Sequence, residues 1–347
     1  MDENEFKVTR RNFLQGVAGV AAVGLISGCA PKVAGGDTPA AQTTVSDIKP
    51  SETLDADIVV VGAGSSGMCA AVQAGELGAK VILLEKNSTL GGNGFGTEGM
   101  FAIGSDIQKK NGVGLDVNFR DIIATEEEFF NYRVDALFWK DMVEASADNL
   151  NWLISNGVPF SGVVDNYYGL GKVDAFHWFK EGKGKYYIEA MEAKAREYGV
   201  DILTKTPAVE LIQQDGQVVG IYAQKEDESY LQINCKAVIL ASGGYADNQD
   251  MMLARGYDLT YAAHQGFPGH DGDGLRMASA AGGEDVSLQR CFLREPYSYG
   301  IDFFGTMTQA IHRGGPFLWV NQDAERYTNE ACGAFTPGNN SNSVHTQ

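Results

Sequence analysis

The sequence predicts an α/β fold with a parallel central sheet, and three observations support this prediction. Residues 56–61 form a β-branched apolar run, which indicates a buried parallel strand. A glycine-rich turn and a helical stretch, residues 68–77, follow directly. A second apolar run, residues 80–84, comes next. Strand, turn, helix and strand in this order form a βαβ unit, whose two strands lie parallel in one sheet.

Composition limits the class of protein. The chain has 347 residues, of which 44% are hydrophobic, so it is long enough for two domains with a sizeable core. Its formal net charge is −18, and it has no basic patch. A surface of this charge repels nucleic acid, so we expect no nucleic-acid partner.

The first residues indicate an export signal. Arg10 and Arg11 precede an apolar stretch, residues 17–26, that is too short to span a membrane but fits a signal-peptide core. The arginine pair matches a twin-arginine signal. Residues 26–29 resemble a lipoprotein signal-peptidase site, which would leave Cys29 as the lipidated first residue. The alternative is a chance arginine pair before a buried helix.

We therefore expect a twin-arginine lipoprotein signal peptide at residues 1–29. The protein would be exported and lipid-anchored on the outer side of the cytoplasmic membrane. Residues 30–54 are rich in Ala, Pro, Thr, Ser and Gly, which indicates a flexible linker.

The glycine-rich turn has the spacing of a dinucleotide-binding motif. Gly62 permits the tight turn, Gly64 lets the backbone approach a pyrophosphate, and Gly67 lets helix and strand pack closely. Ser66 lies at the start of the helix, whose free N–H groups and dipole favour phosphate. Glu85 ends the second strand and can accept hydrogen bonds from ribose hydroxyls. The alternative is a glycine turn that binds nothing.

The next segment distinguishes FAD from NAD. Lys86 is followed by Gly91, Gly92 and Asn93, and a glycine-rich run continues to Gly99. This segment resembles the flavoprotein subunits of the fumarate reductase and succinate dehydrogenase superfamily, in which a Gly-Gly-Asn segment runs along the flavin. The resemblance implies that FAD is the cofactor and that these residues border it.

The resemblance extends over about residues 55–330. Residues 149–158 are similar to the family's helix before the substrate loop, and residues 207–222, with a turn at Asp215 and Gly216, are similar to its β-hairpin near the adenine. Val209 in that hairpin is a candidate adenine contact.

Two further segments match the family. The strand at residues 237–241 leads into Ser242 and Gly243, both candidate cofactor contacts. The segment Gly272-Asp273-Gly274 opens a helix at residues 275–281 and matches the family's Gly-Asp-Gly. Asp273 would meet the ribityl hydroxyls of the flavin or cap the helix.

These matches imply a Rossmann-like FAD-binding domain at residues 55–288 and an α+β capping domain at residues 289–347. The capping domain is expected to be incomplete, because the family continues beyond the segment present here. The chain would then be a fragment or a truncated protein.

The resemblance also implies non-covalent FAD. Membrane-bound succinate dehydrogenases tether the flavin through a histidine near the Gly-Gly segment, and the matching position here is Asn93. The histidines all lie elsewhere in the sequence: His177, His264, His270, His312 and His345. The soluble periplasmic fumarate reductases, of the flavocytochrome c type, also bind FAD without a covalent bond.

The cysteines indicate no metal site and no attached haem. None of the five forms C-x-x-C or C-x-x-C-H, so this chain lacks the pattern of a structural zinc site and of c-type haem. Cys69 and Cys235 lie in apolar segments, where buried inert thiols are expected. Electrons would therefore come from a separate donor, such as a cytochrome or a flavin- or quinol-linked protein.

In the family, hydride passes from flavin N5 to a polarised carbon–carbon double bond, and side chains of the cap donate a proton and stabilise the developing charge. The candidates here are Arg294, Tyr297, Tyr299, His312 and Arg313. For each of them, an ordinary solvated or packed side chain is the alternative.

Some positions of the family's dicarboxylate site are occupied differently. Arg294 stands where a histidine is expected, Ala310 where a glutamate is expected, and Ala334 where an arginine is expected. Arg313 matches the family in the alignment that the segment Val320-Asn321 favours. An alignment shifted by one residue would instead pair Thr308-Gln309 with the family's Thr-Glu and displace the arginine. A dicarboxylate such as fumarate is therefore an unexpected substrate.

These observations together predict an exported FAD-dependent oxidoreductase. The expected reaction is reduction of the activated double bond of a small unsaturated molecule, as in anaerobic respiration. One alternative is a ketosteroid-type dehydrogenase, which shares the scaffold. Another is a truncated FAD-binding remnant without activity.

Overall fold

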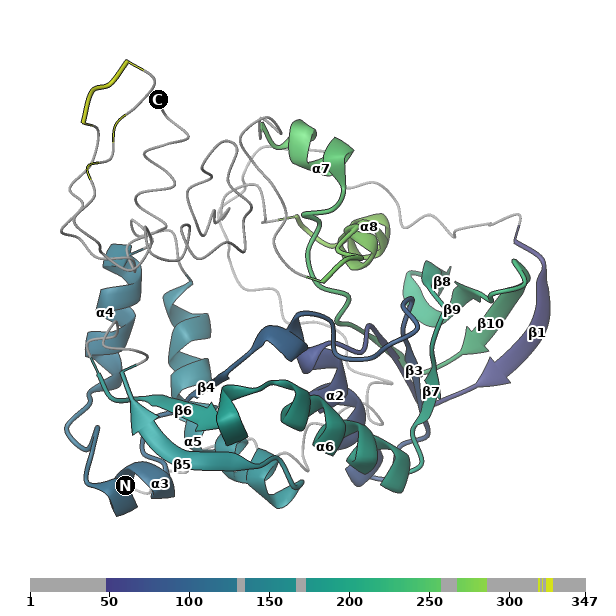
Figure 1. Ribbon diagram of the computed structural model, residues 1–347. Helices are drawn as coiled ribbons and strands as arrows, with labels where there is room; N and C mark the ends of the chain where they lie inside the picture. The colour runs from purple at the N-terminus through teal and green to yellow at the C-terminus, as the bar shows by residue number, and fades with distance from the viewer. Residues whose placement is uncertain are drawn as a thin grey trace, which may run out of the picture. The chain divides into compact units, whose positions relative to one another are not determined.

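The computed structural model describes residues 48–129, 135–166, 173–256 and 267–285, together with residues 318, 320 and 323–326 (Figure 1). The expected signal peptide, most of the expected linker and nearly all of the expected capping domain lie outside these residues. The boundaries of the signal peptide and of the capping domain stay predictions.

The central sheet is fully parallel, as the sequence predicts. Its strands lie in the order β11 (Ala237–Leu240), β2 (Ile58–Val61), β3 (Val81–Leu84) and β7 (Asp201–Leu203). Val59 lies opposite Val238 on one neighbour and Ile82 on the other. Both faces of this sheet are covered by other elements, which explains why β2 and β3 are continuously apolar.

Successive residues of β2 face two different layers. Val60 belongs to a core with helix α2 (Ser65–Glu76) and helix α6 (Lys185–Glu197), which pack against each other (Figure 1). Val59 and Val61 belong to a second core with residues of another sheet. The period-two alternation of a strand thus places one side of the central sheet on helices and the other on strands.

The second sheet has the order β1 (Pro50–Asp55), β10 (Tyr230–Asn234), β9 (Gln217–Gln224) and β8 (Ala208–Gln214). The predicted β-hairpin is confirmed as β8 and β9. Asp215 and Gly216 connect them with φ values of 51° and 76°, the two positive values of a type I′ turn.

Strand β1 corrects the expected linker. It begins at Pro50, inside the segment 30–54 that composition indicates to be flexible, and pairs in parallel with β10. Its residues are mostly exposed, so main-chain pairing and not a buried apolar face orders this strand. Composition carries no signal for such pairing.

A third sheet, in the order β4 (Gly99–Phe101), β6 (Phe176–Phe179) and β5 (Phe160–Asp165), is antiparallel. Helix α3 (Asp106–Asn111) contacts β5 of this sheet. Helices α4 (Phe119–Phe129) and α5 (Ala136–Ser155) contact each other. The helix expected at residues 149–158 is the end of α5, which starts earlier and stops at Ser155. Gly157, with φ of 86°, belongs to the turn that follows.

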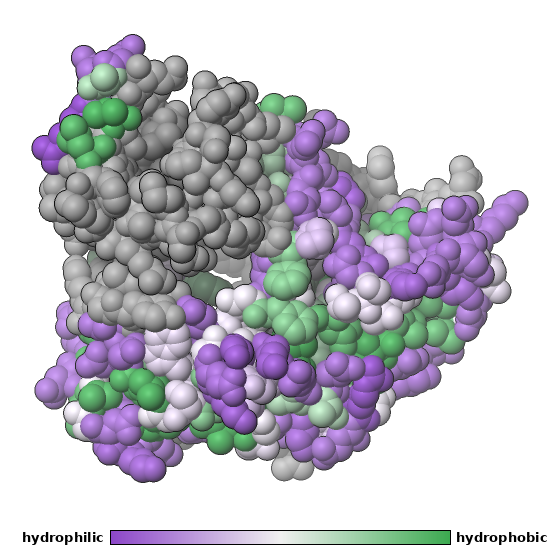
Figure 2. Space-filling view, in the orientation of Figure 1, coloured by the Kyte–Doolittle hydropathy of each residue, from purple (hydrophilic) through white to green (hydrophobic). Residues whose placement is uncertain are grey.

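Short elements complete the described chain: the 3-10 helices η1 (Gly92–Gly96) and η2 (Lys180–Gly182), α7 (Gln249–Ala254) and α8 (Asp273–Ala280). Among the described residues, none of the helices combines the length and apolar character needed to cross a membrane. Figure 2 shows mainly hydrophilic residues on one face of the described chain, with hydrophobic residues in separate patches.

Candidate cofactor site

The turn from β2 into α2 shows why three glycines are needed. Gly62 has φ of +95°, in the region that glycine adopts without strain. A Cβ on Gly67 would lie 1.8 Å from the carbonyl oxygen of Gly62, so this glycine allows close packing of helix and turn. A Cβ on Gly64 would meet nothing nearer than 4.0 Å. Gly64 therefore borders open space.

The open space lies at the N-terminus of α2. Gly64 is the N-cap, and no side chain caps the helix. Gly92 lies across from it, since a Cβ on Gly92 would find only the Cα of Gly64, at 4.0 Å. Ser66 is exposed on the first helical turn. Uncapped N–H groups facing a gap between two glycine segments form a cradle suited to a pyrophosphate.

Glu85 is fixed at the end of β3. It is 8% exposed, and its two carboxylate oxygens accept backbone N–H bonds from Ala63 and Asn87, each 2.8 Å long. These bonds hold the carboxylate against the glycine turn. Each oxygen keeps a further lone pair, which can accept a hydroxyl hydrogen as the sequence predicts.

Lys86 is held by two aspartates, Asp271 in the loop before α8 and Asp273 at the first position of α8. Its Nζ lies 2.6 Å from Asp271 and 2.8 Å from Asp273. Burial alone lowers the pKa of Lys86, but the hydrogen bonds to both aspartates outweigh it and raise the pKa. Asp273 also pairs with Arg276. Lys86 thus works as a cation that joins β3 to the loop.

Asp273 does not cap α8. The N-cap is Gly272, with φ of 76°, and Asp273 is the first helical residue. The hydroxyl of Ser242 instead accepts the backbone N–H of Gly274 over 3.0 Å. The start of α8 is therefore tied to the turn after β11, which brings together Ser242, Gly243 and the Gly-Asp-Gly segment.

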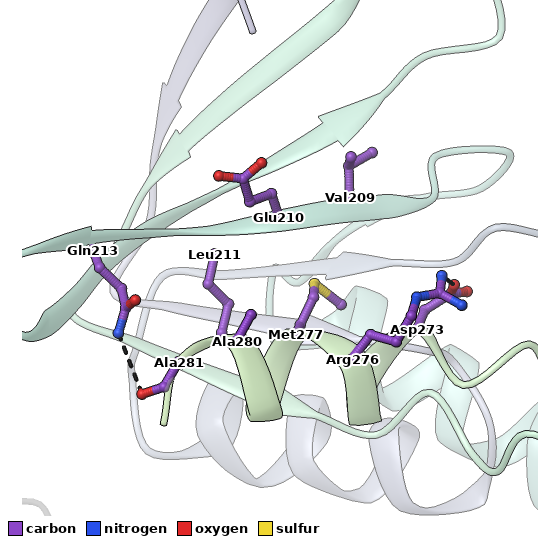
Figure 3. Close-up of a pocket in the computed structure, with 9 residues that line it drawn as sticks. All are labelled: Val209, Glu210, Leu211, Gln213, Asp273, Arg276, Met277, Ala280 and Ala281. Carbon is purple, nitrogen blue, oxygen red and sulfur yellow. Dashed lines mark hydrogen bonds and ion pairs between the residues drawn. The ribbon is translucent and has the colours of Figure 1, made fainter. Parts of the chain in front are cut away.

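Val209 lies on β8 beside a cavity of about 170 Å³ between β8 and α8 (Figure 3). The walls combine apolar side chains with the Asp273 and Arg276 pair. The lining residues are Val209, Glu210, Leu211, Gln213, Asp273, Arg276, Met277, Ala280 and Ala281. Val209 and Asp273, far apart in sequence, thus border one cavity.

Gly91 and Gly99 have different tasks. The backbone N–H of Gly91 donates to the carbonyl of Ala63 over 2.8 Å, which fixes the Gly-Gly segment against the β2 turn. A Cβ on Gly99 would lie 2.1 Å from the carbonyl oxygen of His177. Gly99 therefore permits β4 to approach β6, and this packing task explains the glycine without a cofactor.

Asn93 contacts a histidine that the sequence analysis did not select. Its Nδ2 lies 3.2 Å from Nε2 of His270, and its Oδ1 accepts the backbone N–H of Phe267 over 2.9 Å. His270 lies outside the glycine-rich segment in the sequence. Its position just before the Gly-Asp-Gly segment is the sequence feature that could have identified His270 as part of the site.

The thiols fit the expectation of inert cysteines. Cys69 Sγ lies 2.9 Å from the hydroxyl of Tyr187, and burial raises the pKa of Cys69. Burial also raises the pKa of Cys235, to about 11. Both thiols are therefore protonated and weakly nucleophilic at neutral pH.

The catalytic candidates Arg294, Tyr297, Tyr299, His312 and Arg313 lie outside the described residues. The described part of the site is a dinucleotide cradle: a helix N-terminus, a fixed carboxylate, two glycine segments around open space, and a loop held across them. This donor set fits the two phosphates and ribose hydroxyls of FAD.

Comparison with known families agrees with this geometry. The family model described as FAD binding domain matches residues 57–341. The chain is 34% identical over 284 residues to vinyl phenol reductase of Lactiplantibacillus plantarum, covering 79% of this chain and 56% of that protein. It is 29% identical to fumarate reductase (cytochrome) of Shewanella frigidimarina, covering 81% of this chain and 48% of that protein.

A solved structure shares the fold. The open conformation of a flavocytochrome c3 fumarate reductase superposes with a TM-score of 0.69 and 27% identity, covering 86% of this chain and 51% of that chain. The chain spans about half the length of the curated relatives it matches.

Proposed function

The chain belongs to the FAD-binding domain family that matches residues 57–341, a family of FAD-dependent oxidoreductases, and from this membership we propose that it reduces an activated carbon–carbon double bond. The observation that supports the reaction most strongly is the 34% identity to a vinyl phenol reductase. The electrons would come from a separate carrier.

The described residues would hold FAD in a defined order. The N-terminus of α2, between Gly64 and Gly92, would bind the pyrophosphate, and Glu85 the adenosine ribose. Val209 would border the adenine, and Asp273 the ribityl chain. When bound, FAD supplies the hydride for the double bond. The described residues bind and orient it, whereas the proton donor is sought among the capping residues.

We propose that the flavin is bound without a covalent link. The position matching the tethering histidine is Asn93, whose amide is not nucleophilic. Acid precipitation of the yellow protein should release all flavin into the supernatant. Flavin absorbance that remains in the washed pellet after denaturation would contradict the proposal.

The substrate class follows from charge. A dicarboxylate needs several cations as negative charge develops, yet Ala310 and Ala334 occupy two positions of that site and neither can carry charge. Losing one preorganised donor costs roughly a hundred- to thousand-fold in rate. Vinyl phenol, which the relative's name gives as its substrate, has a conjugated double bond and no carboxylate. An uncharged or monoanionic aromatic alkene is therefore the proposed substrate.

The test is anaerobic alkene reduction with reduced viologen as donor. We expect 4-vinylphenol or a related acrylate to be reduced at least about a hundred-fold faster than fumarate. Arg313→Ala should lower turnover about a hundred-fold with unchanged FAD content. Arg196→Ala, an exposed arginine of α6 paired with Glu192, is the matched control and should keep full turnover. Fast fumarate reduction would contradict the substrate class.

A further inference from the structure

A closed ring of hydrogen bonds joins the Gly-Gly-Asn segment to the loop before α8. The backbone N–H of Phe267 donates to Oδ1 of Asn93 over 2.9 Å. Nδ2 of Asn93 lies 3.2 Å from Nε2 of His270. Nδ1 of His270 lies 2.8 Å from the carbonyl oxygen of Phe267. The amide of Asn93 thus binds the backbone N–H of Phe267, and the imidazole of His270 binds the backbone carbonyl of the same residue.

The ring fixes the position of every proton in it. The N–H of Phe267 can only donate, so the atom of Asn93 that faces it is the oxygen and the atom that faces His270 is the nitrogen. Nε2 of His270 must then accept, which places the imidazole proton on Nδ1, where it is donated to the carbonyl of Phe267. The three hydrogen bonds therefore specify one tautomer of His270, with the proton on Nδ1.

His270 is held independently of Asn93. Its backbone N–H donates to Oδ2 of Asp247 over 2.9 Å. Its ring lies against Gly243, where a Cβ would approach Cδ2 of the ring to 2.8 Å. The imidazole is therefore a fixed acceptor against which the amide of Asn93 is oriented.

We propose that His270 is a positioning residue for FAD that acts through Asn93. The Asn93 side chain is exposed, so its second Nδ2 hydrogen remains available on the side where the flavin is expected. Without an acceptor at Nε2, the amide is held by the N–H of Phe267 alone, so it can tilt and turn this donor away from the flavin. This inference rests on the FAD assignment and does not depend on the alkene substrate.

Two substitutions separate the two ring nitrogens. His270→Gln keeps an acceptor near the position of Nε2, whereas His270→Asn keeps only a donor near Nδ1. Binding is measured by the quenching of FAD fluorescence on addition to the apo form of the whole chain. We expect His270→Asn to raise the Kd for FAD about five- to tenfold, the effect of one lost hydrogen bond, and His270→Gln to change it less than about twofold.

Two controls test whether the effect acts through Asn93. Asn111 is a matched control away from the site, because its exposed side-chain amide donates to the carbonyl of Gly162 over 2.8 Å, and Asn111→Ala should leave the Kd within about twofold. In an Asn93→Ala background, the Gln and Asn variants of His270 should bind FAD equally. A gap that persists in that background, or equal affinities in the native background, would overturn the proposal.

The tautomer gives a test that does not depend on the variants folding. Imidazole nitrogen NMR of the unaltered protein should show His270 with a protonated Nδ1 and a bare Nε2. A protonated Nε2 would contradict the proposed ring of hydrogen bonds. Failure of the unaltered protein to bind FAD would overturn the proposed function as well, and this outcome is distinct from a wrong tautomer with normal FAD binding.

Discussion

Gly64 and Gly67 belong to the same turn but lack side chains for opposite reasons. A methyl group on Gly67 would collide with the backbone oxygen of Gly62, whereas one on Gly64 would enter open space at the helix N-terminus. Gly67 thus serves folding, and we propose that Gly64 serves binding. The spacing of the motif is the same in either case, so only the structure separates the two roles.

This difference gives a matched pair of variants. Gly67→Ala should lower the free energy of unfolding by about 1–3 kcal/mol, the usual cost of overpacking. Gly64→Ala should change it by less than about 1 kcal/mol, because its backbone conformation suits alanine. Gly64→Ala should nevertheless weaken FAD binding about tenfold or more, since its methyl group displaces a charge-assisted hydrogen bond.

Urea unfolding of the apo proteins and FAD titration provide the two measurements. If Gly64→Ala unfolded as readily as Gly67→Ala, the space beside Gly64 would not be a cradle. Normal FAD affinity of Gly64→Ala would also contradict its place at the pyrophosphate.

At the scale of elements, a buried histidine connects the third sheet to α3. His177 of β6 is fully buried. Its Nε2 lies 2.7 Å from the hydroxyl of Ser105, the residue that caps α3, and its Nδ1 lies 3.0 Å from the carbonyl of Ala175. The carbonyl can only accept, so Nδ1 donates to it. Burial favours the neutral imidazole, in which Nε2 accepts the hydroxyl hydrogen of Ser105.

Stability should therefore depend on pH through His177. Burial lowers the pKa of His177 below its ordinary value of 6.5, and backbone hydrogen bonds only partly oppose this. Below about pH 6.5 the unfolded chain binds a proton that the folded chain does not. The His177 contribution to stability is thus complete above about pH 7, and it is lost as pH falls through 6.5 toward the lower folded pKa.

Urea unfolding between about pH 8 and pH 5 checks this dependence. His177→Gln should lower stability at pH 8 but flatten the loss on acidification. Ser105→Ala keeps the buried imidazole, so it should lower stability at all pH values and retain the slope. An unchanged slope in His177→Gln would show that other groups cause the acid sensitivity.

The elements that could be predicted from the sequence are those with local signals. The apolar run of β2, the glycine turn, and the hairpin turn at Asp215 and Gly216 each depend on neighbouring residues. The pairing of β1 with β10 does not, because it joins main-chain groups of segments far apart in the sequence.

The residues of the candidate site also fall into those with a local sequence signal and those without one. Glycine spacing predicted the cradle and the position of Glu85 at the end of β3. The partners of Lys86, Asn93 and His177 depend on how loops pack, and no spacing rule gives them. The packing role of Gly99 could not be predicted either. In the sequence, a glycine that packs against a carbonyl cannot be distinguished from one that borders a ligand.

At the scale of the whole molecule, we propose that the chain is exported with its cofactor and anchored by lipid at Cys29. Substitution of both Arg10 and Arg11 by lysine should leave most of the protein in the cytoplasm, as measured by cell fractionation. Cys29→Ala should abolish incorporation of labelled fatty acid. Lys7→Gln, which leaves the arginine pair intact, is the control and should be exported and lipidated normally.

Fatty-acid label on the Cys29→Ala protein would contradict the lipid anchor. Full export of the double lysine variant would contradict the twin-arginine assignment. These two results are independent, because the pathway depends on the arginine pair and the anchor depends on the cysteine.

The strand pairing has a consequence for synthesis on the ribosome. Val61 pairs with Leu240, and Asp55 pairs with Asn234, so both β2 and β1 need partners that are translated much later. A nascent chain that stops short of β10 leaves β1 without its neighbour and β2 with only one. Non-local pairing of this kind closes slowly. Ser242 and the segment from Phe267 to Gly274 are translated later still, so the proposed cofactor contacts can be complete only after Gly274 has left the ribosome.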